Sequence, residues 1–191
     1  DKSWTKYPYK RQPFLLKALR NDNFSSNLKA RALSSMDPYH ADLTITFLME
    51  LFNEGAEDIQ IEVTRTLSTR ITDAEACKTV RNIAKDKNHN IKIRLEALTG
   101  LGNSAVVNES SINTLLEILS NDQEIDSIRN EAFKNYQSVY PDLNIDQFNL
   151  SLERRPTSLD EWRKYGHEQG DENSGARIFY SGRYQCGSCH R

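Results

Sequence analysis

Apolar side chains recur every three to four positions over most of the first 140 residues. This spacing is that of one face of an α-helix, and no stretch alternates strongly enough with the period of two that predicts a strand. Turn-forming residues separate the periodic stretches. They lie at Asp37-Pro38, Asn53-Glu54-Gly55, Thr72-Asp73, Asn88-His89-Asn90, Gly102-Asn103-Ser104 and Asn121-Asp122. The sequence therefore predicts an all-α fold in which the helices follow one another in pairs.

The predicted pairs repeat along the chain. The second helix of each pair carries an apolar residue, a long polar residue beside it and, one turn later, a position that is small in most copies. The aligned residues are Leu28-Lys29 with Ala32, Ile61-Glu62 with Arg65, Ile93-Arg94 with Ala97, and Ile128-Arg129 with Ala132. A small residue lets neighbouring helices approach, and the polar side chain is expected to lie along the groove between repeats. Arg65 breaks this pattern, so the second repeat is expected to be the weakest.

The best copy of the repeat is NIKIRLEALTGLG, from Asn90 to Gly102, and it resembles a HEAT repeat. The resemblance extends over about residues 12–140. It implies an α-solenoid of about four helix pairs, whose second helices form a concave ridge that usually serves as a binding surface. Residues 1–140 are therefore assigned to a HEAT-like helical repeat domain.

Composition and charge exclude some classes of function. The 191 residues are 37% hydrophobic with a net charge of −2, which gives no general attraction to nucleic acid or an anionic membrane. No apolar run is long enough to span a bilayer. The chain opens at Asp1 without a signal-like segment, so we expect a piece of a longer protein with any export signal upstream.

Two charged stretches allow alternative interpretations. The basic and aromatic stretch WTKYPYKRQPF, residues 4–14, is interpreted as a cap or junction at the open end of the solenoid, with a nucleic-acid contact as the alternative. The run from Asp37 to Glu62 contains seven acidic residues and no Lys or Arg. It is interpreted as a solvated face, with docking of a basic partner as the alternative. Cys77 lies on an apolar helical face and is expected to be buried, and His40 and His89 fall in exposed turns.

The helical pattern of apolar residues ends after Tyr140. Residues 141–156 contain two prolines and no sustained helical stripe, which predicts a linker. Residues 157–191 form a further segment. It opens with a short helix that Ser158 can cap together with Glu161, and Trp162 can fold back on the last repeat.

The last residues, YQCGSCHR, carry the strongest chemical signal. On one turn of helix Cys186 and Cys189 share a face, so both thiols can add to the vinyl groups of a haem as thioethers. His190 can then approach the iron from the proximal side. Two alternatives remain open. A zinc site would need two further ligands from distant positions, and a redox disulfide would lack the strand and helix alternation of a thioredoxin-like fold.

Residues 155–191 resemble the entry to a c-type cytochrome domain. An Arg-Pro and a Trp precede a Gly-Asp and Gly-x-x-x-Phe helix, and Cys-x-x-Cys-His follows. With helical repeats ahead of it, the arrangement is similar to haem-binding, dehydrogenase-associated proteins of planctomycetes, verrucomicrobia and related bacteria. The resemblance implies haem c attached through Cys186 and Cys189, with His190 as proximal ligand, and Gly175 and Phe179 facing a later helix. A cytochrome c domain usually continues past this His to a distal ligand, so residues 157–191 would be the N-terminal part of a truncated domain.

Two functional classes follow from these patterns. The first is an electron-transfer module outside the cytoplasm, in the periplasm or cell envelope, in which the repeats carry haem c for a dehydrogenase domain or redox partner. The second is a protein interaction scaffold without haem. A helical-repeat nucleic-acid binder is a weaker third option. No paired carboxylates, Ser-His-Asp set or phosphate loop suggests catalysis by these residues themselves.

Overall fold

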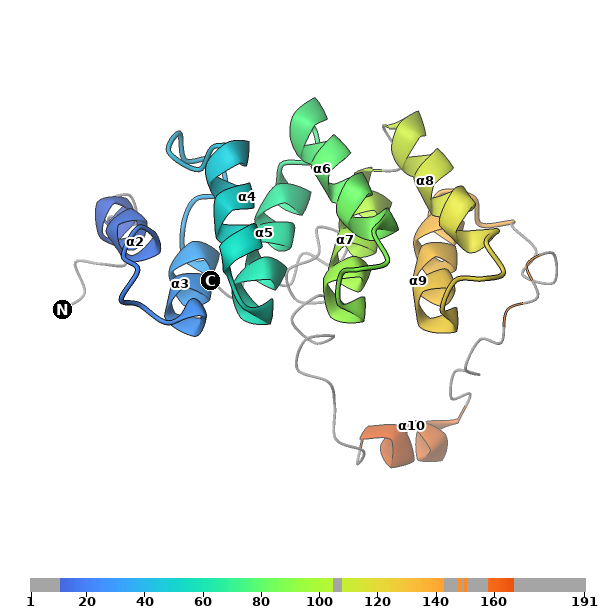
Figure 1. Ribbon diagram of the computed structural model, residues 1–191. Helices are drawn as coiled ribbons and strands as arrows, with labels where there is room; N and C mark the ends of the chain where they lie inside the picture. Colours follow the sequence, from blue (N-terminus) through green and yellow to red (C-terminus); the bar gives the residue numbers. More distant parts are fainter. Residues whose placement is uncertain (1–10, 105–107, 143–147, 149, 151–157, 167–191) are drawn as a thin grey trace. The chain divides into compact units, whose positions relative to one another are not determined.

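A computed structural model of the chain describes residues 11–104, 108–142, 148, 150 and 158–166. Within these residues all nine α-helices can be followed in Figure 1, and no strand is present. The helices are α2 (Gln12–Leu19), α3 (Ser26–Ser34), α4 (Ile45–Glu54), α5 (Glu57–Thr69), α6 (Ala74–Lys85), α7 (Ile91–Ser104), α8 (Glu109–Leu119), α9 (Asp126–Gln137) and α10 (Leu159–Gly166). The predicted all-α class is confirmed for the described residues.

The chain divides into two compact units, residues 1–100 and 101–191. In the first unit α2 packs on α3 and α4 on α5, and α5 also contacts α3 and α6. In the second unit α8 packs on α9. Most of the apolar positions predicted from the helical periodicity supply the core, because Leu33, Leu48, Ala97 and Ala132 are each at most 2% exposed. Leu28 of the first repeat is an exception and is 43% exposed.

One predicted break is wrong. The turn expected at Gly102-Asn103-Ser104 does not form, because α7 continues to Ser104. Gly102 instead allows a close approach within the second unit. A Cβ atom at this position would lie 2.0 Å from Oδ1 of Asn135 on α9. The missing side chain therefore permits helix packing rather than a change of backbone direction.

The turns inside three pairs share one local structure. Asn21, Asp86 and Asn121 each follow the first helix of a pair, and each side-chain oxygen accepts a hydrogen bond from the backbone N–H two residues later. The donor–acceptor distances are 3.0, 2.9 and 3.1 Å, respectively. This bond holds the pKa of Asp86 below its usual value, and the charge of His89 adds to the effect. Such Asx turns explain why the chain reverses here.

The turn of the second pair differs from the other three. Only Gly55 and Ala56 separate α4 from α5. A Cβ atom on Gly55 would lie 1.8 Å from Cγ2 of Ile59 and 2.6 Å from the carbonyl oxygen of Leu51. Glycine is required because the first turn of α5 fills the space that a side chain would occupy.

Two buried arginines close the third and fourth pairs. Arg94 is 1% exposed, and its Nε donates to the carbonyl oxygen of Ala84 at 3.0 Å. Arg129 is 4% exposed and makes the same bond to Leu119, 35 residues later, at 3.1 Å. Both side chains were expected between repeats, but these bonds lie within each arginine's own pair. They satisfy carbonyl groups at the end of the first helix, which lack intrahelical donors.

The helix after the predicted linker begins as the sequence indicates. Oγ of Ser158 accepts a hydrogen bond from the backbone N–H of Glu161, and the Glu161 carboxylate accepts one from the backbone N–H of Ser158, both at 3.2 Å. This reciprocal capping box confirms the predicted start of α10. The side chain of Trp162 lies outside the described part.

Candidate functional site

The residues of the predicted haem site lie outside the described residues. This applies to Cys186, Cys189 and His190, and also to Gly175 and Phe179. Their roles therefore stay predictions from the sequence. Among the residues that the structure does describe, no group of three or more His, Cys, Asp and Glu side chains is arranged to hold a metal ion.

The third cysteine is part of the core, as predicted. Cys77 on α6 is fully buried, and Nη1 of Arg81 lies 3.1 Å from its sulfur atom. The histidine expectation needs a correction, because the side chains of His40 and His89 are only 26% exposed. The His89 ring meets Phe52 edge-on, with 5.2 Å between ring centres. Phe52 itself belongs to the core, so His89 shields apolar surface.

Charge alternates between successive helix pairs of the first unit. The helices of the first pair contain three basic and no acidic residues, those of the second pair one basic and five acidic, and those of the third pair five basic and two acidic. Ion pairs connect neighbouring pairs. They join Arg20 to Asp42 at 3.4 Å, Arg65 to Glu96 at 3.1 Å and Lys92 to Glu57 at 3.1 Å. Two members of the acidic run, Asp42 and Glu57, therefore form ion pairs within the fold.

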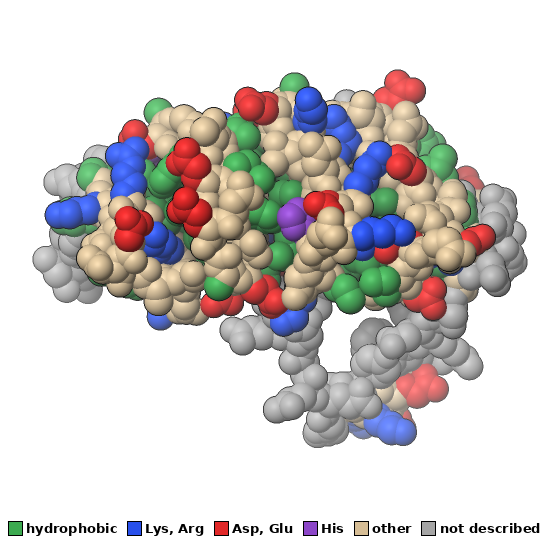
Figure 2. Space-filling model, viewed as in Figure 1, with side chains coloured by type: hydrophobic (Ala, Val, Ile, Leu, Met, Phe, Trp, Pro, Cys, Tyr) green, Lys and Arg blue, Asp and Glu red, His purple; other side chains and the backbone are tan. Residues whose placement is uncertain are grey.

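Some of the acidic run remains on the surface. Glu50 and Glu54 are exposed on α4, which has no basic residue of its own. In the view of Figure 2, acidic side chains lie over α4 and basic side chains over α6. Like charges four residues apart at a helix C-terminus are unfavourable for that helix. Among the described residues, no ion pair or hydrogen bond to either carboxylate offsets this repulsion.

A largely buried charged cluster joins α5 to α7. The Arg65 guanidinium donates to both carboxylate oxygens of Glu96, at 3.1 and 3.3 Å, and also to Glu62. All three side chains are less than 20% exposed. Arg65 occupies the position that is small in the other repeats, and here a bidentate ion pair joins the two helices.

Burial sets the protonation behaviour of this cluster. It raises the pKa of Glu62 above its ordinary value, and the charge and hydrogen bond of Arg65 compensate only in part. Burial also acts to lower the pKa of Arg65, but its bonds to Glu96 and Glu62 outweigh burial and raise it. The cluster contains two carboxylates and one guanidinium. The ionised form of Glu62 is therefore the one that burial disfavours most in this cluster.

We expect Glu62→Gln to keep or increase stability at pH 7, by up to about 1 kcal/mol. The amide still accepts the Arg65 hydrogen bond, and the cost of burying an ionised carboxylate disappears. Because the folded-state pKa of Glu62 is raised, protonation of Glu62 favours the folded state. This contribution to stability is complete below about pH 4.5 and is lost as the pH rises through the folded-state pKa. The difference between variant and wild type should therefore shrink on acidification.

Urea unfolding followed by circular dichroism between pH 4.5 and 7 measures this difference. Glu96→Gln is the matched control, because Glu96 is the more buried carboxylate and forms the bidentate pair, so its loss should destabilise the protein. A clear loss of stability at pH 7 for Glu62→Gln would contradict the conclusion that burying the ionised Glu62 carboxylate destabilises the fold.

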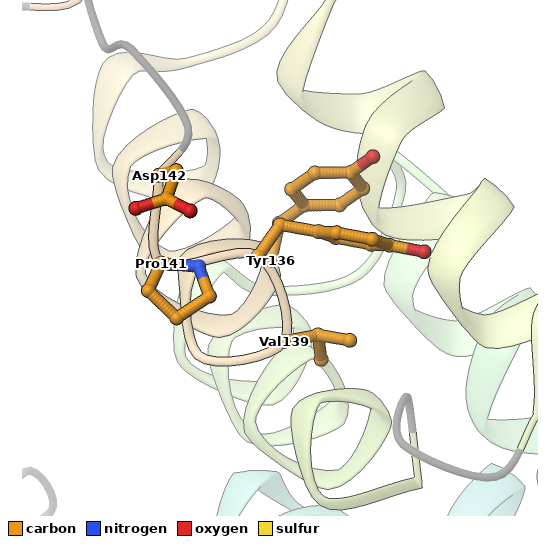
Figure 3. A pocket seen from close by; sticks show the side chains of 5 residues that line it. Tyr136, Val139, Pro141 and Asp142 are labelled. Atoms are coloured by element: carbon orange, nitrogen blue, oxygen red, sulfur yellow. The ribbon is translucent and has the colours of Figure 1, made fainter.

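An open pocket of about 310 Å³ lies where the chain leaves α9 in the second unit. Its lining residues are Tyr136, Val139, Tyr140, Pro141 and Asp142. The two tyrosine rings have centres 5.0 Å apart with 31° between their planes. Figure 3 shows Pro141 and Asp142 together on one side, with the tyrosine rings extending away from them. Burial raises the pKa of Tyr136, and the neighbouring Tyr140 adds to this. The sequence prediction missed this pocket because Tyr136 and Tyr140 are four residues apart, and this spacing is also that of a buried helical face.

Part of the predicted linker 141–156 is fixed to α9. The carbonyl oxygen of Phe148 accepts a hydrogen bond from Nη2 of Arg129 at 2.6 Å, and the Phe148 ring lies 6.5 Å from the ring of Phe133. The same Arg129 nitrogen donates to Asp122 at 3.0 Å. One buried guanidinium thus connects the end of α8, the following turn and the linker.

Two further findings bear on function. Of the helices in the described residues, none has the length and apolar character that crossing a membrane requires. Comparison of the chain with models of protein families, curated protein sequences and solved structures gave no match.

Proposed function

We propose that this chain is an electron-transfer module in which a HEAT-like helical scaffold carries a covalently attached haem c. Cys186 and Cys189 are the attachment residues and His190 is the proximal ligand. The module serves an extracytoplasmic dehydrogenase domain or redox partner. The observation that carries this proposal is the Cys-x-x-Cys-His spacing in the sequence.

The three residues have separate chemical roles in this proposal. Each thiol adds its sulfur and its hydrogen across one vinyl group, so a thioether forms and no atom is lost. The His190 imidazole donates one ring nitrogen to the iron, and its other N–H is free to bond a carbonyl group. Haem c supplies one-electron redox chemistry, while the substrate chemistry belongs to the dehydrogenase.

The described residues support the scaffold part of the proposal. Eight consecutive helices form four pairs, three of which share the same Asx turn. Four stacked pairs would give the α-solenoid that the repeat pattern predicts. The Arg129 bond to Phe148 also shortens the tether to the haem segment. From Phe148 to Ser158 a chain reaches at most about 35 Å, roughly three-fifths of the reach of an unattached linker from Asp142.

A protein interaction scaffold without haem is the second candidate. The Tyr136 pocket and the exposed carboxylates of Glu50 and Glu54 favour it, because each offers an unused surface for a partner. In this case Cys186 and Cys189 would bind a metal, form a disulfide or have no role. The presence of haem separates the two candidates directly.

The test is to express the chain with an export signal in a host that matures c-type cytochromes. We expect a haem c spectrum as the pyridine haemochrome after acid–acetone extraction, because thioether bonds survive this treatment. The Cys186→Ala/Cys189→Ala double variant should lose the haem. Cys77→Ala is the matched control, since this buried thiol should not hold haem. No haem on the wild-type chain, with a matured control cytochrome positive in the same host, would contradict the proposal.

A further inference from the structure

The pocket lined by Tyr136, Val139, Tyr140, Pro141 and Asp142, here called the Tyr136 pocket, has three properties that indicate which kind of ligand it could bind. Its walls are largely apolar, formed by Val139, Pro141 and the tyrosine rings. The two rings are tilted by 31° with their centres 5.0 Å apart, and Tyr140 is 45% exposed. All lining residues come from one short stretch, so the shape does not depend on distant contacts. Concave apolar sites with a few polar groups are typical binding sites.

The charge of the pocket selects the sign of its ligand. Asp142 is the only charged side chain that lines it, and it is exposed. The helices of the surrounding pair, α8 and α9, carry four acidic and two basic residues. A pocket lined by one carboxylate and by aromatic rings favours a cationic side chain over an anionic one, through charge attraction and cation–π attraction.

The shape of the pocket favours an extended segment. Two tyrosines and a proline on an open surface resemble the aromatic grooves that bind proline-rich peptides, in which the ligand is already extended and loses little entropy. Tyrosine is also a residue that commonly contributes most to protein interfaces, because its ring buries a large area with few rotatable bonds.

We propose that the Tyr136 pocket binds an extended segment of a partner protein that carries Lys or Arg next to proline. The cation enters the pocket that Asp142 and the tyrosine rings line, and the proline packs on Val139 and Pro141. This site lies in described residues and does not depend on haem attachment, so it goes beyond the electron-transfer role.

Nuclear magnetic resonance of the full ¹⁵N-labelled chain tests the proposal. The probe is the acetylated and amidated peptide Ala-Pro-Pro-Lys-Pro-Pro-Arg-Ala, and the comparison peptide has Glu in place of Lys and Arg. We expect saturable shifts of amide signals from residues 136–142 with the basic peptide, weakened by added salt, and none with the acidic peptide. Tyr140→Ala should weaken binding about tenfold and Asp142→Asn about threefold.

Two control variants make the result specific. Tyr39→Ala removes another exposed tyrosine, 61% accessible in the first unit, and should leave binding unchanged. Glu50→Gln/Glu54→Gln removes the exposed acidic pair of α4 and should also have no effect. Equal binding of both peptides, shifts located at α4, or no shift at millimolar peptide would overturn the proposal. Shifts that depend on protein concentration without peptide would overturn it in favour of a second copy of the chain.

Discussion

Arg129→Ala is expected to destabilise the second unit by about 3 kcal/mol. The guanidinium is 4% exposed and binds the Leu119 carbonyl, the Asp122 carboxylate and the Phe148 carbonyl. Hydrogen bonds from a charged donor contribute about 1.5–3 kcal/mol each, and acceptors left without a donor in a buried place add a desolvation cost. Since the three acceptors belong to separate segments, all three should loosen together.

Hydrogen exchange of backbone amides in α8 and α9 is the suitable measurement, because it reports the second unit separately from the first. Arg129→Lys should recover only part of the loss, since an ammonium group cannot reproduce the planar arrangement of donors. Lys134→Ala is the matched control on the same helix. Its side chain is 57% exposed and pairs with Glu131, so the expected loss is below about 0.5 kcal/mol. Similar exchange rates in the alanine variants of Arg129 and Lys134 would show that the buried bonds contribute little.

The helices of this protein were predictable because each needs only a local pattern. Apolar residues at helical spacing marked the buried face, and turn-forming residues marked most of the ends. The capping box of Ser158 and Glu161 was predictable for the same reason. Gly102 was misread because the sequence cannot distinguish a glycine that ends a helix from one that admits a neighbouring helix.

Contacts between distant residues were not predictable from the sequence. Arg65 was recognised only as an exception, since its partner Glu96 lies 31 residues away on another helix. Arg129 was aligned correctly with Arg94, but its bond to Phe148 requires the path of the chain beyond α9. The haem motif is the opposite case. Its three residues lie within five consecutive positions, so the chemistry could be predicted without any tertiary structure, and it remains a prediction.

Gly100→Ala is expected to destabilise the first unit by about 2–3 kcal/mol, although alanine is the better helix former. Gly100 on α7 is buried against α5, and an added Cβ atom would lie 2.1 Å from Oγ and 2.5 Å from Cβ of Ser68. A serine Cβ is fixed to its backbone, so no rotamer change can relieve the overlap. The two helices would have to separate.

The same geometry predicts that a second substitution restores stability. Ser68→Gly removes both clashing atoms and leaves Cα of residue 68 3.4 Å from the new Cβ, close to van der Waals contact. It also removes a buried hydroxyl without a hydrogen-bond partner in the described structure. The helix propensity gained at residue 100 offsets the loss at residue 68. Gly100→Ala/Ser68→Gly should therefore unfold in urea within about 1 kcal/mol of the wild type.

The double-mutant cycle isolates this contact from general effects of glycine and alanine. Strong coupling, on the order of 2–3 kcal/mol in favour of the pair, would show that α5 and α7 approach through Gly100 and Ser68. Gly55→Ala provides a contrast within the same unit. Its clash involves the Leu51 carbonyl oxygen as well as Ile59, so Ser68→Gly cannot rescue it. Additive effects of the Gly100 and Ser68 substitutions would mean that the two helices are farther apart in solution than this packing requires.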